Sequence, residues 1–293
     1  MPTQQMAPPG AQDRKPFDEE IDVYGLTHTG KVRPDNQDHF LISALRKQMV
    51  VYQTSLPSPE RVVGGSERLA FLAMVADGVG GGAKGEEASR VVLEDVTQYV
   101  SGTMRCYYTT GSENDMEFTR ALQEVALQSS AELRRRGEED PEYHGMATTL
   151  TLFLGVWPKA YLLQVGDSRC YVFRNGELRQ ITHDQTMAQE LMDMGVLKAS
   201  DVAGTRFART LSSSIGGRMT DPVVTRLEMS WGTVVLLCSD GLTGHVPDDR
   251  IRERLRAMTS AKQACEDLLR DALDAGGTDN VTIIVGRALR KAD

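Results

Sequence analysis

Four aspartates spread over most of the chain each lie at or next to the end of a predicted β-strand, in a turn rich in glycine or asparagine. They are Asp38 in PDNQD (34–38), Asp77 in VADGVGGG (75–82), Asp240 in CSDGL (238–242) and Asp279 in GGTDN (276–280). An unpaired buried carboxylate costs several kcal/mol or loses its charge, so packing does not explain these positions. A multivalent cation with oxygen ligands is a simple way to keep several carboxylates ionised in one place.

Taken singly, each of these motifs has an ordinary structural explanation. The Asp-Gly pairs match tight turns, Gly276 and Gly277 match a helix end, and Arg33 fits a surface ion pair with a nearby aspartate. A fifth aspartate, Asp167 in VGDSR (165–169), also lies at a predicted strand end. Turns alone do not explain five such carboxylates with an arginine in one chain. An arginine beside a carboxylate cluster suits bidentate binding of a phosphate oxyanion.

The composition is that of a soluble globular protein and narrows the possible partners. The 293 residues are 40% hydrophobic and 25% charged, with a net charge of −8 and a pI near 5.3. This charge argues against a nucleic-acid-binding surface and against an anionic membrane partner, but it does not exclude phosphorylated substrates. The chain has no run of about 18 apolar residues, and its start lacks the pattern of a signal peptide, so we expect a cytoplasmic protein.

The four cysteines predict neither a disulfide framework nor a zinc site. Cys106, Cys170, Cys238 and Cys265 are widely spaced and form no CxxC pair. Three of them lie in apolar segments, where a buried free thiol is the usual state. A reducing cytoplasm agrees with this pattern.

The periodicity of the chain predicts an α+β fold in a single domain. We expect residues 1–20 to form a disordered tail and residues 21–290 to form the domain, with a mixed, glycine-rich excursion over about 184–218. Asn175 and Gly176 predict a two-residue hairpin turn, and Gly137 predicts a helix end. Strands are expected over 21–30, 39–55, 69–76, 148–156, 160–173, 177–182, 233–241 and 281–289, and helices over 84–102, 116–136, 248–258 and 261–275.

Six segments together resemble the protein phosphatase 2C-like family of metal-dependent serine/threonine phosphatases. They are GKVRPDNQD, VADGVGG, GMATTL, VGDSR, CSDGL and GGTDNVTIIV, in the order and spacing typical of that family. The resemblance runs from about residue 21 to 288, and the short connections are similar to the bacterial branch. It implies a four-layer αββα sandwich of two antiparallel sheets flanked by helices, in which residues 184–218 form a flap over the cleft.

The resemblance also implies a centre of two Mn²⁺ or Mg²⁺ ions. In this arrangement Asp77 bridges both ions, the Gly78 carbonyl holds the second, and Asp240 and Asp279 bind the first. Asp38 is expected to act through water, and Asp167 with Asp240 matches the place of a third, weaker ion. Arg33 is expected to bind the substrate phosphate.

Two metal ions about 3.5–4 Å apart lower the pKa of a bridging water and neutralise phosphate charge, so hydroxide can attack phosphorus in line. No cysteine or serine nucleophile is needed. Two positions depart from many eukaryotic members: Val79 stands where they have a histidine proposed as proton donor, and Gln37 stands in place of a glutamate. The proton donor therefore stays open, and so does a direct metal ligand at position 37.

Three function classes remain at this stage. A phosphatase of phosphoserine and phosphothreonine proteins, monomeric and opposing a bacterial-type kinase, is the first. A catalytically silent family member that acts as a binding module would have lost its ligands, whereas Asp77, Asp240, Asp279 and Arg33 are all present. A different two-metal enzyme such as a nuclease is disfavoured by the acidic pI.

Overall fold

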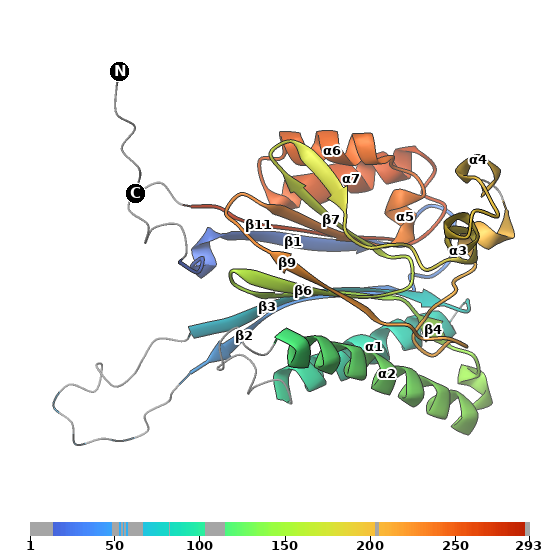
Figure 1. Ribbon diagram of the computed structural model, residues 1–293, viewed down its shortest axis with the longest axis horizontal. Helices are drawn as coiled ribbons and strands as arrows, with labels where there is room; N and C mark the ends of the chain where they lie inside the picture. The colour runs from blue at the N-terminus through green and yellow to red at the C-terminus, as the bar shows by residue number, and fades with distance from the viewer. Residues whose placement is uncertain are drawn as a thin grey trace.

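Two antiparallel sheets face each other, and helices cover their outer faces (Figure 1). The computed structural model describes residues 14–48, 53, 55, 57, 67–81, 83–102, 115–202 and 205–290. One sheet has the order β1 (Ile21–His28), β11 (Val281–Ala288), β10 (Val234–Cys238), β7 (Arg169–Arg174) and β8 (Glu177–Gln180). The other has the order β2 (Asp38–Lys47), β3 (Glu67–Val79), β5 (Leu150–Val156), β6 (Lys159–Val165) and β9 (Val223–Glu228), with β4 (Ala147–Thr148) paired to β3.

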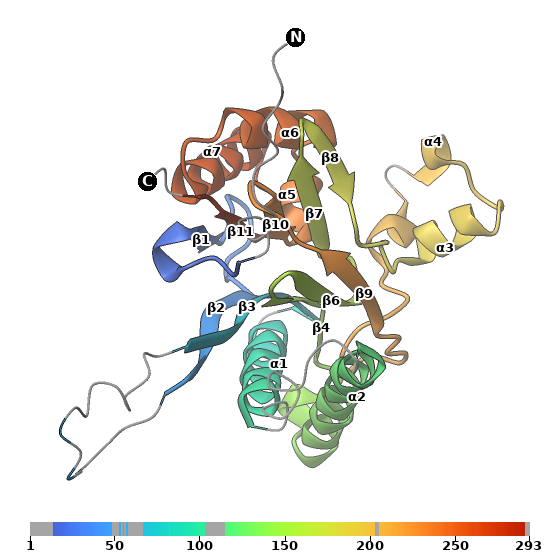
Figure 2. The same cartoon turned by 60° about the vertical axis from the view of Figure 1, so that its left-hand side comes forward.

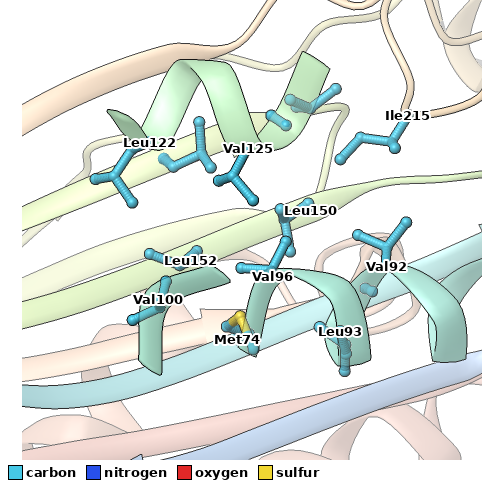
Figure 3. Close-up of a cluster of buried hydrophobic side chains, with 14 of the residues drawn as sticks. Met74, Val92, Leu93, Val96, Val100, Leu122, Val125, Leu150, Leu152 and Ile215 are labelled. Atoms are coloured by element: carbon cyan, nitrogen blue, oxygen red, sulfur yellow. The ribbon is translucent and has the colours of Figure 1, made fainter. Parts of the chain in front are cut away.

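Three hydrophobic cores hold the layers together. Helices α1 (Ala83–Gly102) and α2 (Asp115–Glu139) pack on the β3 sheet, where Met74, Val96 and Leu150 are buried among them (Figure 3). Helices α5 (Asp240–Thr243), α6 (Asp248–Ala257) and α7 (Ala261–Asp274) pack on the β10 sheet. A third core lies between the sheets. The four-layer αββα prediction is confirmed.

The alternation of side chains along β3 places its final aspartate. Leu72 and Met74 point to the helices, while Ala73 and Val75 point to the opposite sheet. Because successive side chains in a strand alternate between its faces, Asp77 shares the inter-sheet face with Ala73 and Val75. The apolar strand thus carries its carboxylate to the end of the inter-sheet layer.

The predicted hairpin turn and the predicted helix end at Gly137 had different outcomes. Asn175 and Gly176 have φ values of 52° and 85°, as the predicted two-residue hairpin between β7 and β8 requires. The predicted helix end at Gly137 is wrong, because α2 continues to Glu139. A Cβ on Gly137 would lie 3.0 Å from the Tyr143 carbonyl oxygen, so the glycine permits the short helix η5 (Pro141–Tyr143) to approach α2.

The apolar segment 160–173 forms two strands instead of one. Gly166, with φ +104°, lies in the turn after β6, and β7 then joins the opposite sheet. Strands β4 and β9 and the short helix α5 were not predicted. The ends of the other predicted elements agree within a few residues, except that β2 ends at Lys47; residues 49–52 of that predicted strand lie outside the described residues.

The predicted boundary between tail and domain falls too late in the chain. Residues 14–20, which include the short helix η1 (Asp18–Glu20), contact the folded domain. Arg14 pairs with Glu20 at 2.6 Å, and Arg68 donates to the Pro16 carbonyl and pairs with Asp18. The prediction of disorder is therefore wrong for residues 14–20, and residues 1–13 lie outside the described part of the chain.

The cysteine prediction is confirmed for three of the four residues. Cys170, Cys238 and Cys265 are buried free thiols, and Cys106 lies outside the described residues. Among the helices that the structure describes, none is both long and apolar enough to cross a membrane.

The excursion predicted over 184–218 projects from one end of the sandwich (Figure 2). It contains α3 (Met187–Asp193), α4 (Ala199–Val202) and η6 (Arg206–Arg209). At its base Gln185 accepts from the Ser212 backbone N–H at 3.0 Å, and the Met187 N–H donates to the Thr210 carbonyl at 2.8 Å. Figure 1 shows that this excursion lies at the same end of the sandwich as α5 and β4.

Candidate metal centre

The turns that carry the predicted site aspartates meet at one end of the two sheets. Asp38 and Asp77 are direct cross-strand neighbours on β2 and β3. Asp240 begins α5 immediately after β10, and Asp279 lies just before β11, which is the neighbour of β10. Asp167 lies in the turn between β6 and β7. The structure therefore brings all five aspartates to the same end of the inter-sheet layer.

Two glycines in these motifs permit contacts that no larger residue allows. A Cβ on Gly78 would lie 2.1 Å from the carbonyl oxygen of Gly85, so α1 packs directly against the end of β3. A Cβ on Gly241 would lie 1.8 Å from the Asn280 carbonyl oxygen. Because real contacts of this kind are never so short, glycine is required where the Asp240 turn meets the Asp279 turn.

Asp38 is buried, with 3% of its surface exposed, and only one of its oxygens is hydrogen-bonded. Ser239 and Thr282 each donate a hydroxyl to Oδ2 at 2.7 Å. Oδ1 has no partner among the described residues. Burial raises the pKa of Asp38 to about 7, the two hydroxyls oppose this, and the charges of Asp240 and Asp279 add to it.

Asp77 and Asp167 have raised pKa values for similar reasons. Burial first, and then the charges of Asp38, Asp240, Asp167 and Asp279, raise the pKa of Asp77 well above its usual range. Burial and the charge of Asp240 raise the pKa of Asp167 to about 8. Each carboxylate thus disfavours ionisation of its neighbours, as expected for a cluster that lacks enough positive charge.

The main chain of Asp77 is held firmly by two threonines. Its N–H donates to Thr149 Oγ1 at 3.0 Å, and its carbonyl accepts from the Thr149 N–H and the Thr148 hydroxyl at 2.9 Å each. Both threonines belong to the GMATTL segment. This segment therefore positions the predicted bridging aspartate without contributing a carboxylate of its own.

Arg33 and Asp279, predicted to bind different partners, contact each other. Arg33 Nη2 donates to Asp279 Oδ2 at 2.7 Å, and this hydrogen bond is the main cause that raises the pKa of Arg33. The arginine side chain is 49% exposed and the aspartate 30%, so the pair lies at the open side of the cluster. A phosphate that reached Arg33 would therefore also be next to the carboxylates.

The donor set fits a hard divalent cation, although the side chains are not assembled around one point. Asp38 has a buried oxygen without a partner among the described residues, and the neighbouring aspartates raise the pKa of Asp77. A bound cation would bond that oxygen and compensate the negative charge of the cluster. Within the described ranges, no three acidic, histidine or cysteine side chains form a ready group for one ion. Asp279 is an example, because its carboxylate pairs with Arg33.

Several positioning residues in this centre were not identified from the sequence. Asn280 Nδ2 donates to the carbonyls of Thr29 and Asp35 at 2.9 Å each, and its Oδ1 accepts from the Gln37 N–H. Asn280 thus joins the Asp279 turn to the Asp38 turn.

Ser239 and Thr282 were also missed, as partners of Asp38. Ser239 precedes Asp240 and Thr282 follows Asp279 by three positions, so a polar residue close to a predicted site aspartate was the signal that could have identified them.

The two departures from eukaryotic members have different surroundings. Val79 is 37% exposed at the end of β3 and offers no proton. The Gln37 carbonyl accepts from the Ser89 hydroxyl at 2.6 Å and from the Gly78 N–H at 3.2 Å, so its main chain ties the Asp38 turn to α1 and β3.

His245 supports the turn that presents Asp279, because its Nε2 accepts from the Thr278 N–H at 2.9 Å.

Asp167 is linked to the base of the flap. The Gly166 N–H donates to Gln185 Oε1 at 2.7 Å, and the Gln185 N–H donates back to the Gly166 carbonyl at 3.1 Å. The neighbouring Arg169 binds Asp184 through two nitrogens, at 2.7 and 2.9 Å. Hydrogen bonds and an ion pair therefore join the turn that carries the predicted third-ion aspartate to the first residues of the flap.

Comparison with known proteins agrees with this architecture. The model of the family described as protein phosphatase 2C matches residues 62–275. Serine/threonine protein phosphatase PstP of Mycobacterium tuberculosis is 33% identical over 216 residues, which are 74% of this chain and 40% of that protein. Serine/threonine phosphatase stp of Listeria monocytogenes is 29% identical over 217 residues, 73% of this chain and 83% of that protein. The chain thus spans well under half of the mycobacterial relative.

Solved structures show the same fold. The crystal structure of the M. tuberculosis phosphatase PstP/Ppp superposes with a TM-score of 0.72 at 28% identity and covers 92% of this chain and 99% of that one. A second structure, of the PstP catalytic domain in complex with two manganese ions, superposes with a TM-score of 0.69 at 28% identity, again over 92% and 99% of the two chains. By sequence, fold and the order of its motifs, this chain belongs to the protein phosphatase 2C family.

Proposed function

We propose that this protein is a metal-dependent phosphatase that hydrolyses phosphoserine and phosphothreonine in proteins. The observation that carries the proposal is the cluster of five aspartates, in which the buried Asp38 has one oxygen without a partner in the described part of the chain. The manganese-bound PstP domain, with the same fold, supports Mn²⁺ as the cofactor. Mg²⁺ as an alternative ion and a third ion near Asp167 belong to the proposal as well.

The roles of the residues follow from their positions. Two bound ions would activate a water and neutralise the phosphate charge. Asp77, central in the cluster, would contact both ions, with the Gly78 carbonyl beside it, while Asp240 and Asp279 would hold one of them. Asp38, held by two hydroxyls in a buried position, would accept a hydrogen bond from an ordered water.

Arg33 changes partner in this scheme. It pairs with Asp279 at 2.7 Å, and bound ions would draw Asp279 away from the guanidinium. Arg33 would then offer two parallel N–H donors to the phosphate oxygens and stabilise their charge as the serine or threonine oxygen leaves. Arg33 lies at the exposed side of the cluster, where a phosphate can reach it.

The substrates and partners belong to the same proposal. Phosphoproteins modified by a serine/threonine kinase are the substrate class, and a monomer in the cytoplasm is the proposed working state. The flap, joined through Gln185 to Gly166 beside Asp167, lies at the end of the sandwich where a phosphoprotein would approach. The net charge of −8 disfavours a nucleic-acid substrate.

The direct test is hydrolysis of a phosphothreonine peptide by protein first stripped with a chelator. Phosphate release should require added Mn²⁺ and should be lost in Asp240→Asn. Asp35→Asn, which removes an exposed carboxylate from the turn that carries Asp38, is the matched control and should keep activity. Binding of the peptide without hydrolysis in saturating Mn²⁺ would contradict the proposal and would favour a catalytically silent binding module.

A further inference from the structure

The inter-sheet layer is incompletely filled at the end away from the aspartates. A pocket of about 110 Å³ opens there between the two sheets. Its walls continue the inter-sheet core and come from both sheets: Val23 of β1, Phe71 and Ala73 of β3, Phe153 and Gly155 of β5, Val235 and Leu237 of β10, and Ile284, Gly286 and Ala288 of β11. The walls are therefore almost entirely apolar.

The pocket is separate from the aspartate cluster. Phe71 in its wall and Asp77 in the cluster lie on the same face of β3, six residues apart. Since a strand rises about 3.3 Å per residue, the two lie about 20 Å apart. A ligand in the pocket would not touch the phosphatase site.

Small residues at inward positions of the strands leave the space open. On β11 the inward residues are Ile284, Gly286 and Ala288. Gly286 does not need to be glycine for its backbone, because its φ is not in the left-handed region, and an added Cβ would meet only Val23, at 3.4 Å. Glycine there costs strand stability and keeps the volume of a side chain vacant.

The mouth of the pocket carries an excess of positive charge. The residues that line the pocket include four basic side chains and no acidic one. Three of the four pair with carboxylates outside the lining: Arg68 with Asp18, Lys159 with Asp115 and Arg287 with Asp22. The fourth is Lys15.

Lys15 lacks a bonded carboxylate among the described residues. Its ammonium donates to the backbone carbonyls of Arg68 and Leu69. Burial, and then the nearby charge of Arg68, lower its pKa, and the charges of Glu67 and Asp18 oppose this. An anion at the mouth would add a directly bonded counter-charge to this ammonium.

Trp157 lines the wall of the pocket, but its indole Nε1 is buried away from solvent-accessible space and offers no donor to a ligand there. The pocket thus combines apolar walls with one cation, Lys15, that bonds no carboxylate among the described residues.

We propose that this pocket is a binding site for a small monocarboxylic acid, whose apolar body lies between the sheets and whose carboxylate meets Lys15 at the mouth. An apolar cavity of about 150 Å³ holds a molecule the size of benzene, so a pocket of about 110 Å³ matches an apolar body of about four carbons. Apolar contact supplies the affinity, and the basic mouth selects the acid over a neutral molecule of the same length.

The test is binding of pentanoate, with 1-pentanol as the neutral probe of the same length. Calorimetric titration and thermal unfolding are carried out on the full chain in the presence of a chelator, so that the aspartate cluster plays no part. Pentanoate should bind to the protein and raise the unfolding midpoint. It should bind at least about tenfold more tightly than pentanol, as the loss of a charge-assisted hydrogen bond implies.

Two substitutions locate the binding. Lys15→Met should weaken pentanoate binding about tenfold and leave pentanol binding unchanged, whereas Ala288→Phe should block both probes by filling the partly exposed end of the pocket. Gly286→Val fills the same space and replaces Ala288→Phe if that variant does not fold, and Asp77→Asn should bind pentanoate like the unmodified protein. The proposal is overturned if pentanoate does not bind, if pentanol binds equally well, or if a folded, filled variant keeps its affinity.

Discussion

Replacing Asp38 with asparagine should stabilise the metal-free protein, and it should do so more at pH 8 than at pH 5. Asparagine has nearly the same shape, and its oxygen accepts the hydroxyls of Ser239 and Thr282 that Asp38 now accepts. The substitution removes a buried carboxylate whose second oxygen has no partner among the described residues. Two differences remain: the cost of ionising that carboxylate in a buried site, which depends on pH, and the cost of the amide N–H donors that asparagine places where Oδ1 has no partner among the described residues, which does not.

The magnitude and sign follow from the pKa of Asp38, raised from 3.8 to about 7 chiefly by burial. A raised pKa in the folded state means that the contribution of Asp38 to stability is lost as pH rises from the unfolded value toward 7. At pH 8 this loss amounts to about 4 kcal/mol, and at pH 5, where the folded carboxyl is protonated, to about 2 kcal/mol. The asparagine variant should recover these amounts less about 1–3 kcal/mol for its unpartnered amide donors, so its gain is clear at pH 8 and small at pH 5.

Urea unfolding followed by circular dichroism, in the presence of a chelator and at each pH, measures the effect. Asp35→Asn, which removes an exposed carboxylate three positions away, is the control and should show no gain that grows with pH. If Asp38→Asn is equally stable or less stable than the unmodified protein at both pH values, the reasoning about an uncompensated buried carboxylate is refuted.

Further predictions concern the same end of the molecule. Asp77→Asn should lose Mn²⁺ binding, measured by calorimetry, and turnover by more than about a thousandfold, since it removes a ligand proposed to contact both ions; normal Mn²⁺ affinity would contradict that role. Arg33→Ala should mainly raise KM for a phosphopeptide, while Mn²⁺ affinity stays equal or rises because Asp279 loses its arginine partner; loss of metal binding would contradict this assignment. Gly241→Ala should lower stability by about 1–3 kcal/mol through its clash with the Asn280 carbonyl, seen as a lower thermal unfolding midpoint, and an unchanged midpoint would show that the two turns can move apart.

Much of the candidate site could be predicted because its chemistry is local in the sequence. Asp77 and Asp240 each follow an apolar strand and precede a glycine, and this pattern can be recognised without knowledge of the rest of the chain. The glycines proved to be required by close backbone approach at Gly78 and Gly241. Local pattern thus predicted which residues would meet.

Features that depend on distant partners could not be predicted in this way. The Asp38 carboxylate is held by Ser239 and Thr282, more than 200 positions away, and Arg33 pairs with Asp279 across 246 positions. Segment 160–173 is apolar on both sides of Gly166, so nothing in its periodicity showed that its halves belong to opposite sheets. The pocket between the sheets arises from small residues on three strands, β3, β5 and β11, which are unremarkable one at a time.

The central claim is that the aspartate cluster binds the catalytic metal ions, and a crystal grown with Mn²⁺ tests it most directly. An anomalous difference map at the manganese edge should show two peaks within ligand distance of Asp77, one of them also contacted by Asp240 and Asp279, with Arg33 released from Asp279. A well-ordered cluster with no manganese peak at Asp77, or with peaks only elsewhere on the molecule, would contradict the account.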